Sequence, residues 1–121
     1  SSFWSIGEGD KGKEVELFGM SYSMQPDPAW AAMWFTCEQV GVWNWQRWCN
    51  EEWDALYDKG LVTLDEAERN QIYIDMEKIW DSEAHAVWIT HGVYAYAYST
   101  AIAPAVTPHG DPQVQFFGPA Q

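Results

Sequence analysis

A tryptophan-rich run, WNWQRWCNEEWDALY, contains the residues with the clearest potential for binding chemistry. Arg47 lies there between Trp45 and Trp48. A guanidinium among aromatic rings can hold an anionic or planar ligand group by a forked hydrogen bond or by stacking. The same side chain can instead form an ion pair with Glu51 or Glu52, which would give it a structural role only. The sequence leaves both interpretations open.

Two cysteines, Cys37 and Cys49, flank this run and lie twelve positions apart. Zinc ligands usually occur in pairs two to four residues apart, so the spacing gives no reason to expect a metal. A disulfide would close the intervening residues into a loop and would stabilise the fold by about 3 kcal/mol in the chain-entropy model. The spacing alone leaves a disulfide and free thiols equally open.

The remaining reactive side chains do not form a catalytic pattern. His85 and His91 are six residues apart, about 20 Å in an extended strand, so they cannot share a metal ion, and His109 lies in a Pro-Gly turn. Carboxylates cluster at the starts of predicted helices, where the helix dipole explains them. The serines lack a nucleophile-elbow motif, and the cysteines lack a protease context. We therefore expect no enzymatic activity, no cofactor and no metal.

Composition narrows the possible partners. The 121 residues carry 18 Asp and Glu against six Lys and Arg, a net charge of −12, which argues against a nucleic-acid partner. Nine tryptophans are many for one small domain to bury. Either the core is unusually aromatic, or some rings line a cleft or contact a surface that this chain lacks.

Turn and capping signals predict the elements that position these residues. A strand starts at Glu14 and runs into a loop. Asp27, followed by proline, caps a helix over Ala29–Thr36. Asn50 caps a helix that ends at Gly60, and a capping box from Thr63 to Glu66 starts a third helix that ends near Ser82.

The last third of the chain is predicted to be extended. Residues 84–99 have a strand-like pattern in which Tyr94, Tyr96 and Tyr98 share one face. Residues 101–121 hold four of the six prolines and are predicted to be an extended C-terminal tail. The length allows one domain at most.

From Glu16 onward, the order of motifs resembles the C-terminal segment of family 5 extracellular solute-binding proteins, the receptors of peptide, nickel and oligosaccharide ABC importers. The matching stretches are ELFGMSYSMQPDPAW, WNWQRWCNEEWDALYDKG and LDEAERNQIYIDMEKIWDSEAHAVWITH. They contain a strand entering a DP turn, an N-x-x-(aromatic)-D-x-L helix at Asn50–Leu56, and a D-x-x-x-R-x-x-x-Y helix at Asp65–Tyr73. A strand at Ala84–Ile89 follows. About five sixths of the chain is covered.

The resemblance implies a fold and a covalent bond. The chain would be an α/β (α+β) fragment from the C-terminal lobe of a two-lobe periplasmic-binding-protein-like fold, with residues 1–121 forming a single partial domain. Bared lobe surfaces would then explain the many tryptophans. Dipeptide-binding members carry disulfide-bonded cysteines at the places that Cys37 and Cys49 occupy, so the resemblance favours a disulfide over free thiols, in an oxidising compartment.

The resemblance also implies a ligand site. In two-lobe receptors the cleft is built from loops at strand ends. The first candidate is the loop after the first strand, and the second is the tryptophan-rich loop, in which Trp43 and Trp45 would share a face of extended chain. The expected ligand-binding residues are Met20, Ser21, Tyr22, Ser23, Trp43, Trp45 and Arg47. The alternative is that the tryptophans of the second loop pack inward.

One departure bears on the ligand. Peptide-binding members place an aspartate for the peptide ammonium where this chain has Ser23, and a cleft tryptophan where it has Met20. The solute could therefore be a peptide, an oligosaccharide or an opine-like compound.

The function implied is that of a non-catalytic substrate-binding component of a bacterial ABC importer, which delivers a small solute to permease subunits in the membrane. Its expected location is the periplasm, or the outer face of the membrane in a Gram-positive organism. A fragment with bared apolar faces is expected to self-associate. The alternative is a carbohydrate-binding or catalytic domain of a secreted polysaccharide-degrading protein.

Overall fold

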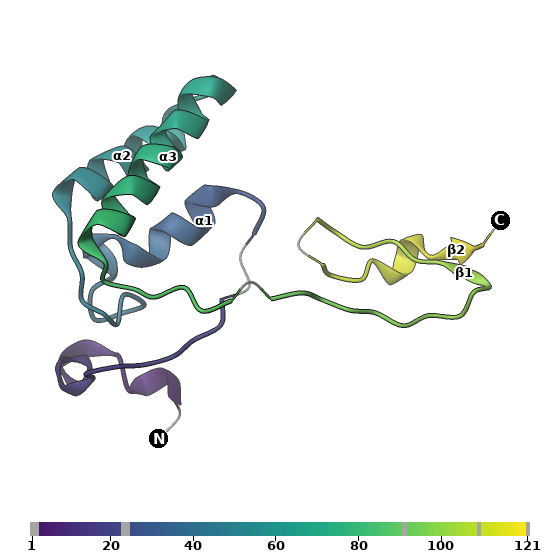
Figure 1. Ribbon diagram of the computed structural model, residues 1–121, viewed down its shortest axis with the longest axis horizontal. Helices are drawn as coiled ribbons and strands as arrows, with labels where there is room; N and C mark the ends of the chain where they lie inside the picture. The colour runs from purple at the N-terminus through teal and green to yellow at the C-terminus, as the bar shows by residue number, and fades with distance from the viewer. Residues whose placement is uncertain (1–2, 23–24, 91, 109, 121) are drawn as a thin grey trace. The chain divides into compact units, whose positions relative to one another are not determined.

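The computed structural model describes residues 3–22, 25–90, 92–108 and 110–120. The chain divides into two compact units, residues 1–87 and residues 88–121. The first is helical and the second contains a two-stranded sheet, so the protein is a small mixed structure of the α+β kind (Figure 1). That residues 1–121 form one partial domain of a larger lobe stays a prediction.

Two helices form the centre of the first unit. Helix α2, Glu51–Val62, begins at Asn50, whose side chain accepts a hydrogen bond from the backbone N–H of Trp53, as the sequence predicts. Helix α3, Glu66–Glu83, follows after only three residues. So short a connection makes the two helices antiparallel neighbours, and they lie side by side in Figure 1.

The start of α3 differs from the predicted capping box. Asp65, rather than Thr63, caps the helix by accepting a hydrogen bond from the backbone N–H of Glu68. Thr63 ends α2 instead, and its hydroxyl donates to the carbonyl oxygen of Lys59. Thr63 and Asp65 are each followed three residues later by a glutamate, so the local sequence suits a cap at either place.

A shorter helix packs against this pair. Helix α1, Pro28–Ala32, starts at Asp27 as predicted, with the carboxylate accepting from the backbone N–H of Ala29. The predicted single helix over Ala29–Thr36 is shorter in the structure, because it tightens into a 3₁₀ turn at Met33–Phe35. This turn directs Phe35 into the core, where its ring meets Trp80 of α3 at 4.1 Å.

The core is aromatic and comes from all three helices. Phe35 meets Trp80 edge to face and Trp53 packs against Trp80 at a tilt, and such aromatic pairs add to the free energy gained by burial alone. The buried members are Ala32, Phe35, Trp53, Ile72, Tyr73, Met76 and Trp80. An unusually aromatic core therefore accounts for part of the tryptophan content.

The predicted strand from Glu14 does not form. The N-terminal segment contains 3₁₀ turns at Phe3–Ser5 and Gly9–Glu14, and the described residues 15–22 have no regular structure. In the described part of the first unit no strand is present with which it could pair, and an isolated strand leaves its backbone groups without partners.

The second unit is a hairpin beside an extended segment. Strand β1, Ile102–Ala103, pairs antiparallel with strand β2, Gly118–Pro119. Further in, Gln113 N–H donates to the carbonyl of Ala105, and Val106 forms a bridge with Pro112. The predicted extended tail over 101–121 is thus folded back on itself. The strand-like pattern over residues 84–99, with the Ala84–Ile89 strand of the resemblance, does not give a strand, because the described residues 85–90 and 92–99 contain no regular element.

Candidate functional site

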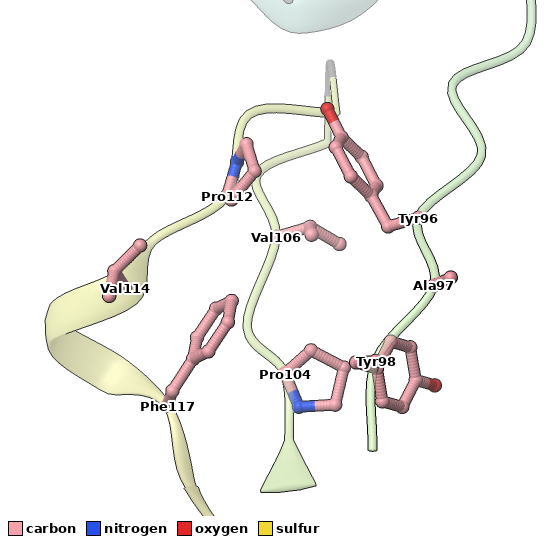
Figure 2. A pocket seen from close by; sticks show the side chains of 8 residues that line it. All are labelled: Tyr96, Ala97, Tyr98, Pro104, Val106, Pro112, Val114 and Phe117. Atoms are coloured by element: carbon pink, nitrogen blue, oxygen red, sulfur yellow. The ribbon is translucent and has the colours of Figure 1, made fainter.

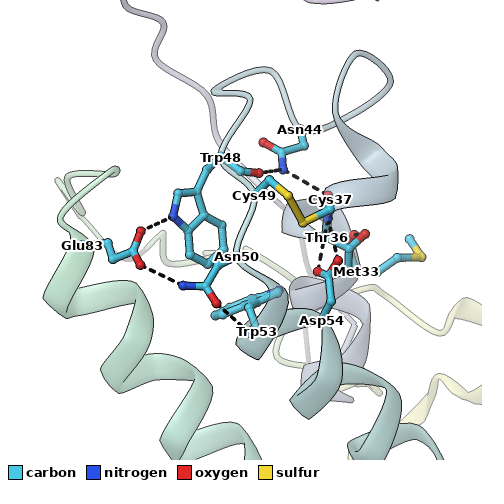
Figure 3. Close-up of a disulfide and its surroundings, with 10 residues drawn as sticks. All are labelled: Met33, Thr36, Cys37, Asn44, Trp48, Cys49, Asn50, Trp53, Asp54 and Glu83. Atoms are coloured by element: carbon cyan, nitrogen blue, oxygen red, sulfur yellow. Dashed lines mark hydrogen bonds between the residues drawn. A yellow bond between two sulfur atoms is a disulfide. The ribbon is translucent and has the colours of Figure 1, made fainter.

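Cys37 and Cys49 form a disulfide that closes the tryptophan-rich loop (Figure 3). The disulfide that the resemblance implies is therefore confirmed. Both carboxylate oxygens of Asp54, in the first turn of α2, accept from the backbone N–H of Cys37 at 3.2 Å. The loop is thus joined to α2 at both of its ends, covalently and by hydrogen bonds.

A buried asparagine holds the inside of the loop. Asn44 is 0 % exposed, and its side-chain amide donates to the carbonyl oxygens of Thr36 at 3.1 Å and Trp48 at 2.6 Å (Figure 3). These two carbonyls lie next to the two cysteines in the chain. The amide therefore holds together the same two ends of the loop that the disulfide joins.

The loop is coiled rather than extended. Backbone N–H groups of Val42, Trp43 and Asn44 converge on the carbonyl oxygen of Gln39 at 2.9–3.1 Å. Gly41 makes the turn possible with a φ of 84°, in the left-handed region that favours glycine. The prediction that Trp43 and Trp45 share one face is consequently wrong, because that alternation requires extended chain.

Trp45 faces inward and is only 2 % exposed. Its ring packs against Phe3 at 5.3 Å and Phe18 at 5.5 Å, and its indole N–H donates to the carbonyl of Val42. The ring also covers Gly7, where a side chain would have no room. A ligand could reach Trp45 only if this packing opened, so its geometry fits the structural alternative.

Trp43 is the accessible ring of the loop, with 42 % of its surface exposed. It meets Trp34 at 4.9 Å, and Trp34 meets Tyr22 edge-on at 5.5 Å. We call Tyr22, Trp34 and Trp43 the aromatic triplet. It brings together the two loops that the sequence singles out, through Trp34, which belongs to the helix predicted over Ala29–Thr36.

Two features of the aromatic triplet bear on binding. The indole nitrogen of Trp34 is buried without a hydrogen-bond partner, so a ligand could reach this donor only if the packing around it opened. Burial raises the pKa of the Tyr22 hydroxyl, which stays neutral at physiological pH. The triplet can therefore stack on a flat ligand through the exposed ring of Trp43, without carrying charge.

The other described residues expected in the first loop have no contact that links them to the aromatic triplet among the described interactions. Met20 is half-buried and Ser21 is exposed. Ser23, the position where peptide-binding members carry aspartate, lies outside the described residues. Their assignment to a ligand site stays a prediction.

Arg47 has a structural partner. Its Nη1 donates to the carbonyl oxygen of Gly9 at 3.0 Å, and the N–H of Gly9 donates back to the carbonyl of Gly41 in the same loop. The pKa of the neighbouring Asp10 is lowered mainly by Lys13 and to a lesser extent by Arg47. Arg47 thus fastens the N-terminal segment to the loop, and its predicted ion pair with Glu51 or Glu52 is absent among the described contacts.

A polar cluster lies behind the loop, at the end of α3. Glu83 accepts from the indole N–H of Trp48 at 2.7 Å and from the side-chain amide of Asn50 at 2.8 Å, and these bonds lower its pKa (Figure 3). His85 stacks on Trp48 with ring centres 4.2 Å apart and meets Trp80 edge-on. Burial lowers the pKa of His85, so it is held as the neutral imidazole.

The second unit contains a small apolar pocket of about 170 Å³, shown in Figure 2. Ligand clefts usually measure about 300–1,000 Å³, so this one is small for a solute. Its lining comes from the extended segment and from both arms of the hairpin: Tyr96, Ala97, Tyr98, Pro104, Val106, Pro112, Val114 and Phe117.

The described residues contain no group of three or more His, Cys, Asp and Glu side chains placed to hold a metal ion. In the same part of the chain, none of the helices combines the length and the apolar character that a membrane crossing requires. No protein-family model, curated protein or solved structure matches this chain. The function is therefore inferred from its own geometry and motifs.

Proposed function

We propose that this chain is part of the substrate-binding component of a bacterial ABC importer. It would be a non-catalytic receptor that captures a small solute outside the cytoplasmic membrane and delivers it to permease subunits. The single observation that carries the proposal is the way in which the motif residues behind the resemblance join one another. These residues meet in two sets of contacts, one at the start of α1 and one at the disulfide.

The first motif residues meet at the start of α1. Asp27 of the DP turn forms an ion pair with Arg69 of the D-x-x-x-R-x-x-x-Y helix, with N and O 2.8 Å apart. Arg69 also donates to the carbonyl of Gly60 at 3.0 Å and to the hydroxyl of Tyr73 at 3.1 Å. One guanidinium thus joins three helices, which explains why arginine suits this place.

The second set meets at the disulfide. In the N-x-x-(aromatic)-D-x-L motif, Asn50 caps α2, Trp53 enters the core and Asp54 binds the backbone of Cys37. The Cys37–Cys49 bond itself is of the kind that persists in oxidising compartments, which suits a periplasmic or extracellular location.

The aromatic triplet is the candidate contact with the solute. Stacking on the exposed ring of Trp43 suits a flat solute such as an oligosaccharide. The same exposed ring favours the second candidate function, a carbohydrate-binding domain of a secreted polysaccharide-degrading protein. The two candidates differ in whether the ligand is a free solute or a polymer.

The experiment measures binding with matched tryptophan variants. A tripeptide, a linear gluco-oligosaccharide and an opine-type amino acid are titrated by calorimetry against the chain and its Trp43→Ala and Trp30→Ala variants. Trp30, on α1, is 44 % exposed against 42 % for Trp43 and is therefore a matched control. Trp43→Ala should weaken binding of the active solute roughly tenfold to a hundredfold, and Trp30→Ala should not.

The possible outcomes distinguish the receptor proposal from its alternatives. Equal losses in both variants would remove the aromatic triplet from the site. Retention on an insoluble polysaccharide, without binding of free solutes, would favour the carbohydrate-binding domain. If native mass spectrometry of the protein from its own cells shows no bound small molecule, and none of the three solutes binds, the receptor proposal fails.

A further inference from the structure

The charge of this protein is distributed very unevenly. The chain carries a net charge of −12, yet residues 84–110 contain no Asp, Glu, Lys or Arg. In the second unit, residues 88–121, the only charged side chain is Asp111. Two copies of a chain with a net charge of −12 repel each other, and the second unit is the part through which they can approach without bringing many like charges together.

Part of the same unit has backbone groups without hydrogen-bond partners. For Ala95, Tyr96, Ala97 and Tyr98, no N–H or C=O of the described structure is hydrogen-bonded. Such an extended segment presents a row of donors and acceptors that can pair with another strand. Alanine and tyrosine alternate along it, and Figure 2 shows the ring of Tyr96 directed toward the hairpin of its own unit.

The sequence of this segment is a palindrome. Tyr94-Ala95-Tyr96-Ala97-Tyr98 is the same in both directions, with Tyr96 at the centre. Antiparallel pairing of two copies about Tyr96 therefore sets Tyr94 opposite Tyr98 and Ala95 opposite Ala97. Every tyrosine faces a tyrosine and every alanine an alanine, so one register satisfies both faces of the ribbon.

We propose that two copies of this chain form a two-fold dimer by antiparallel pairing of residues 93–99, with Tyr96 on the axis. A two-fold interface requires a surface that is complementary to itself, and a palindromic strand meets that requirement. Aromatic pairs directly across an antiparallel ribbon are among its most favourable side-chain pairs. The tyrosines keep their contact with the hairpin, because opposite residues of the two strands point to the same side. The proposal is independent of the transport function.

The register is tested by disulfide trapping. In the proposed pairing Val93 lies opposite Ser99 of the other copy, whereas two copies of Val93 are roughly 20 Å apart, and so are two copies of Ser99. Val93→Cys and Ser99→Cys proteins are therefore oxidised with copper phenanthroline, separately and as an equimolar mixture. Neither substitution alters the tyrosine palindrome.

The mixture should give several-fold more cross-linked dimer on a non-reducing gel than either protein alone, and peptide mass spectrometry should find a bond between positions 93 and 99. Equal cross-linking of each protein alone would overturn the antiparallel register. A mixture that does not cross-link would overturn the interface.

The dimer itself is tested by analytical ultracentrifugation of the full chain. Tyr96→Lys places two like charges opposite each other on the axis and should shift the protein from dimer to monomer. Val114→Lys adds the same charge at a 68 % exposed apolar position of the same unit and should leave the dimer intact. A monomeric parent chain, a series of larger species, or a Tyr96→Lys protein that stays dimeric would each overturn the proposal.

Discussion

Removing the Cys37–Cys49 disulfide should lower the free energy of unfolding by more than the loss of any single hydrogen bond beside it would. With Cys37 and Cys49 twelve positions apart, the chain-entropy model gives about 3 kcal/mol for the Cys37→Ser/Cys49→Ser protein. The loss arises in the unfolded chain, which becomes free to expand, so the folded contacts of Asn44 and Asp54 do not compensate for it. For a unit of this size the midpoint of thermal unfolding should fall by roughly 12–24 °C.

The assay is urea unfolding of the parent and the double variant, followed by tryptophan fluorescence and circular dichroism. The denaturant slope should rise, because the unfolded chain without the cross-link exposes more surface. Near-native fluorescence of the folded variant would show that the loop keeps its shape. A loss below about 1 kcal/mol would refute the reasoning, since it would mean that the unfolded chain already holds the two ends together.

Two further predictions concern the core. As pH falls below about 6.5, the free energy of unfolding should decrease until the lowered pKa of folded His85 is reached, because the unfolded chain binds this proton first. His85→Phe, which keeps a ring between Trp48 and Trp80, should flatten that part of the stability profile, and an unchanged slope would contradict the assignment. Gly60→Ala should destabilise the protein in chemical denaturation, although alanine favours helix, because the added methyl would lie 2.9 Å from the Tyr73 hydroxyl and 3.0 Å from the ring carbon that bears it. The check is that Gly60→Ala costs less in a Tyr73→Phe background than in the parent, which compares each protein with its own background and so cancels the lost Arg69 hydrogen bond.

The helix starts at Asp27 and Asn50 were predicted correctly because a capping side chain bonds to backbone groups only a few residues away. Asn50 and the Asp27-Pro28 pair each satisfy backbone donors within three residues, so their sequence context is sufficient. The start of α3 was misplaced because Thr63 and Asp65 both suit a cap, whereas Thr63 ends α2 by bonding to the carbonyl oxygen of Lys59, which leaves Asp65 to cap α3. The strand from Glu14 failed for the opposite reason, since a strand depends on a partner that the local sequence does not reveal.

The candidate site was only partly predictable. Tyr22 and Trp43 were expected from two separate loops, but the ring that joins them, Trp34, lies in the predicted helix over Ala29–Thr36 and was not expected at the site. Trp43 and Trp45 have the same residue type and nearly the same context, yet one is exposed and the other buried. What separates them is the coiled backbone between them, in which the N–H groups of Trp43 and Asn44 bond to Gln39, and no hydrophobic pattern encodes that coil.

The position of the disulfide along the chain also has a consequence for biosynthesis. Both cysteines are synthesised before any residue of α3, and a loop of this length closes in about 10–100 ns once its ends are free to meet. Phe35 and Trp53, however, gain their contacts with Trp80 only after α3 has been made. Oxidation can therefore precede formation of the aromatic core, so that the last helix docks onto a loop already closed.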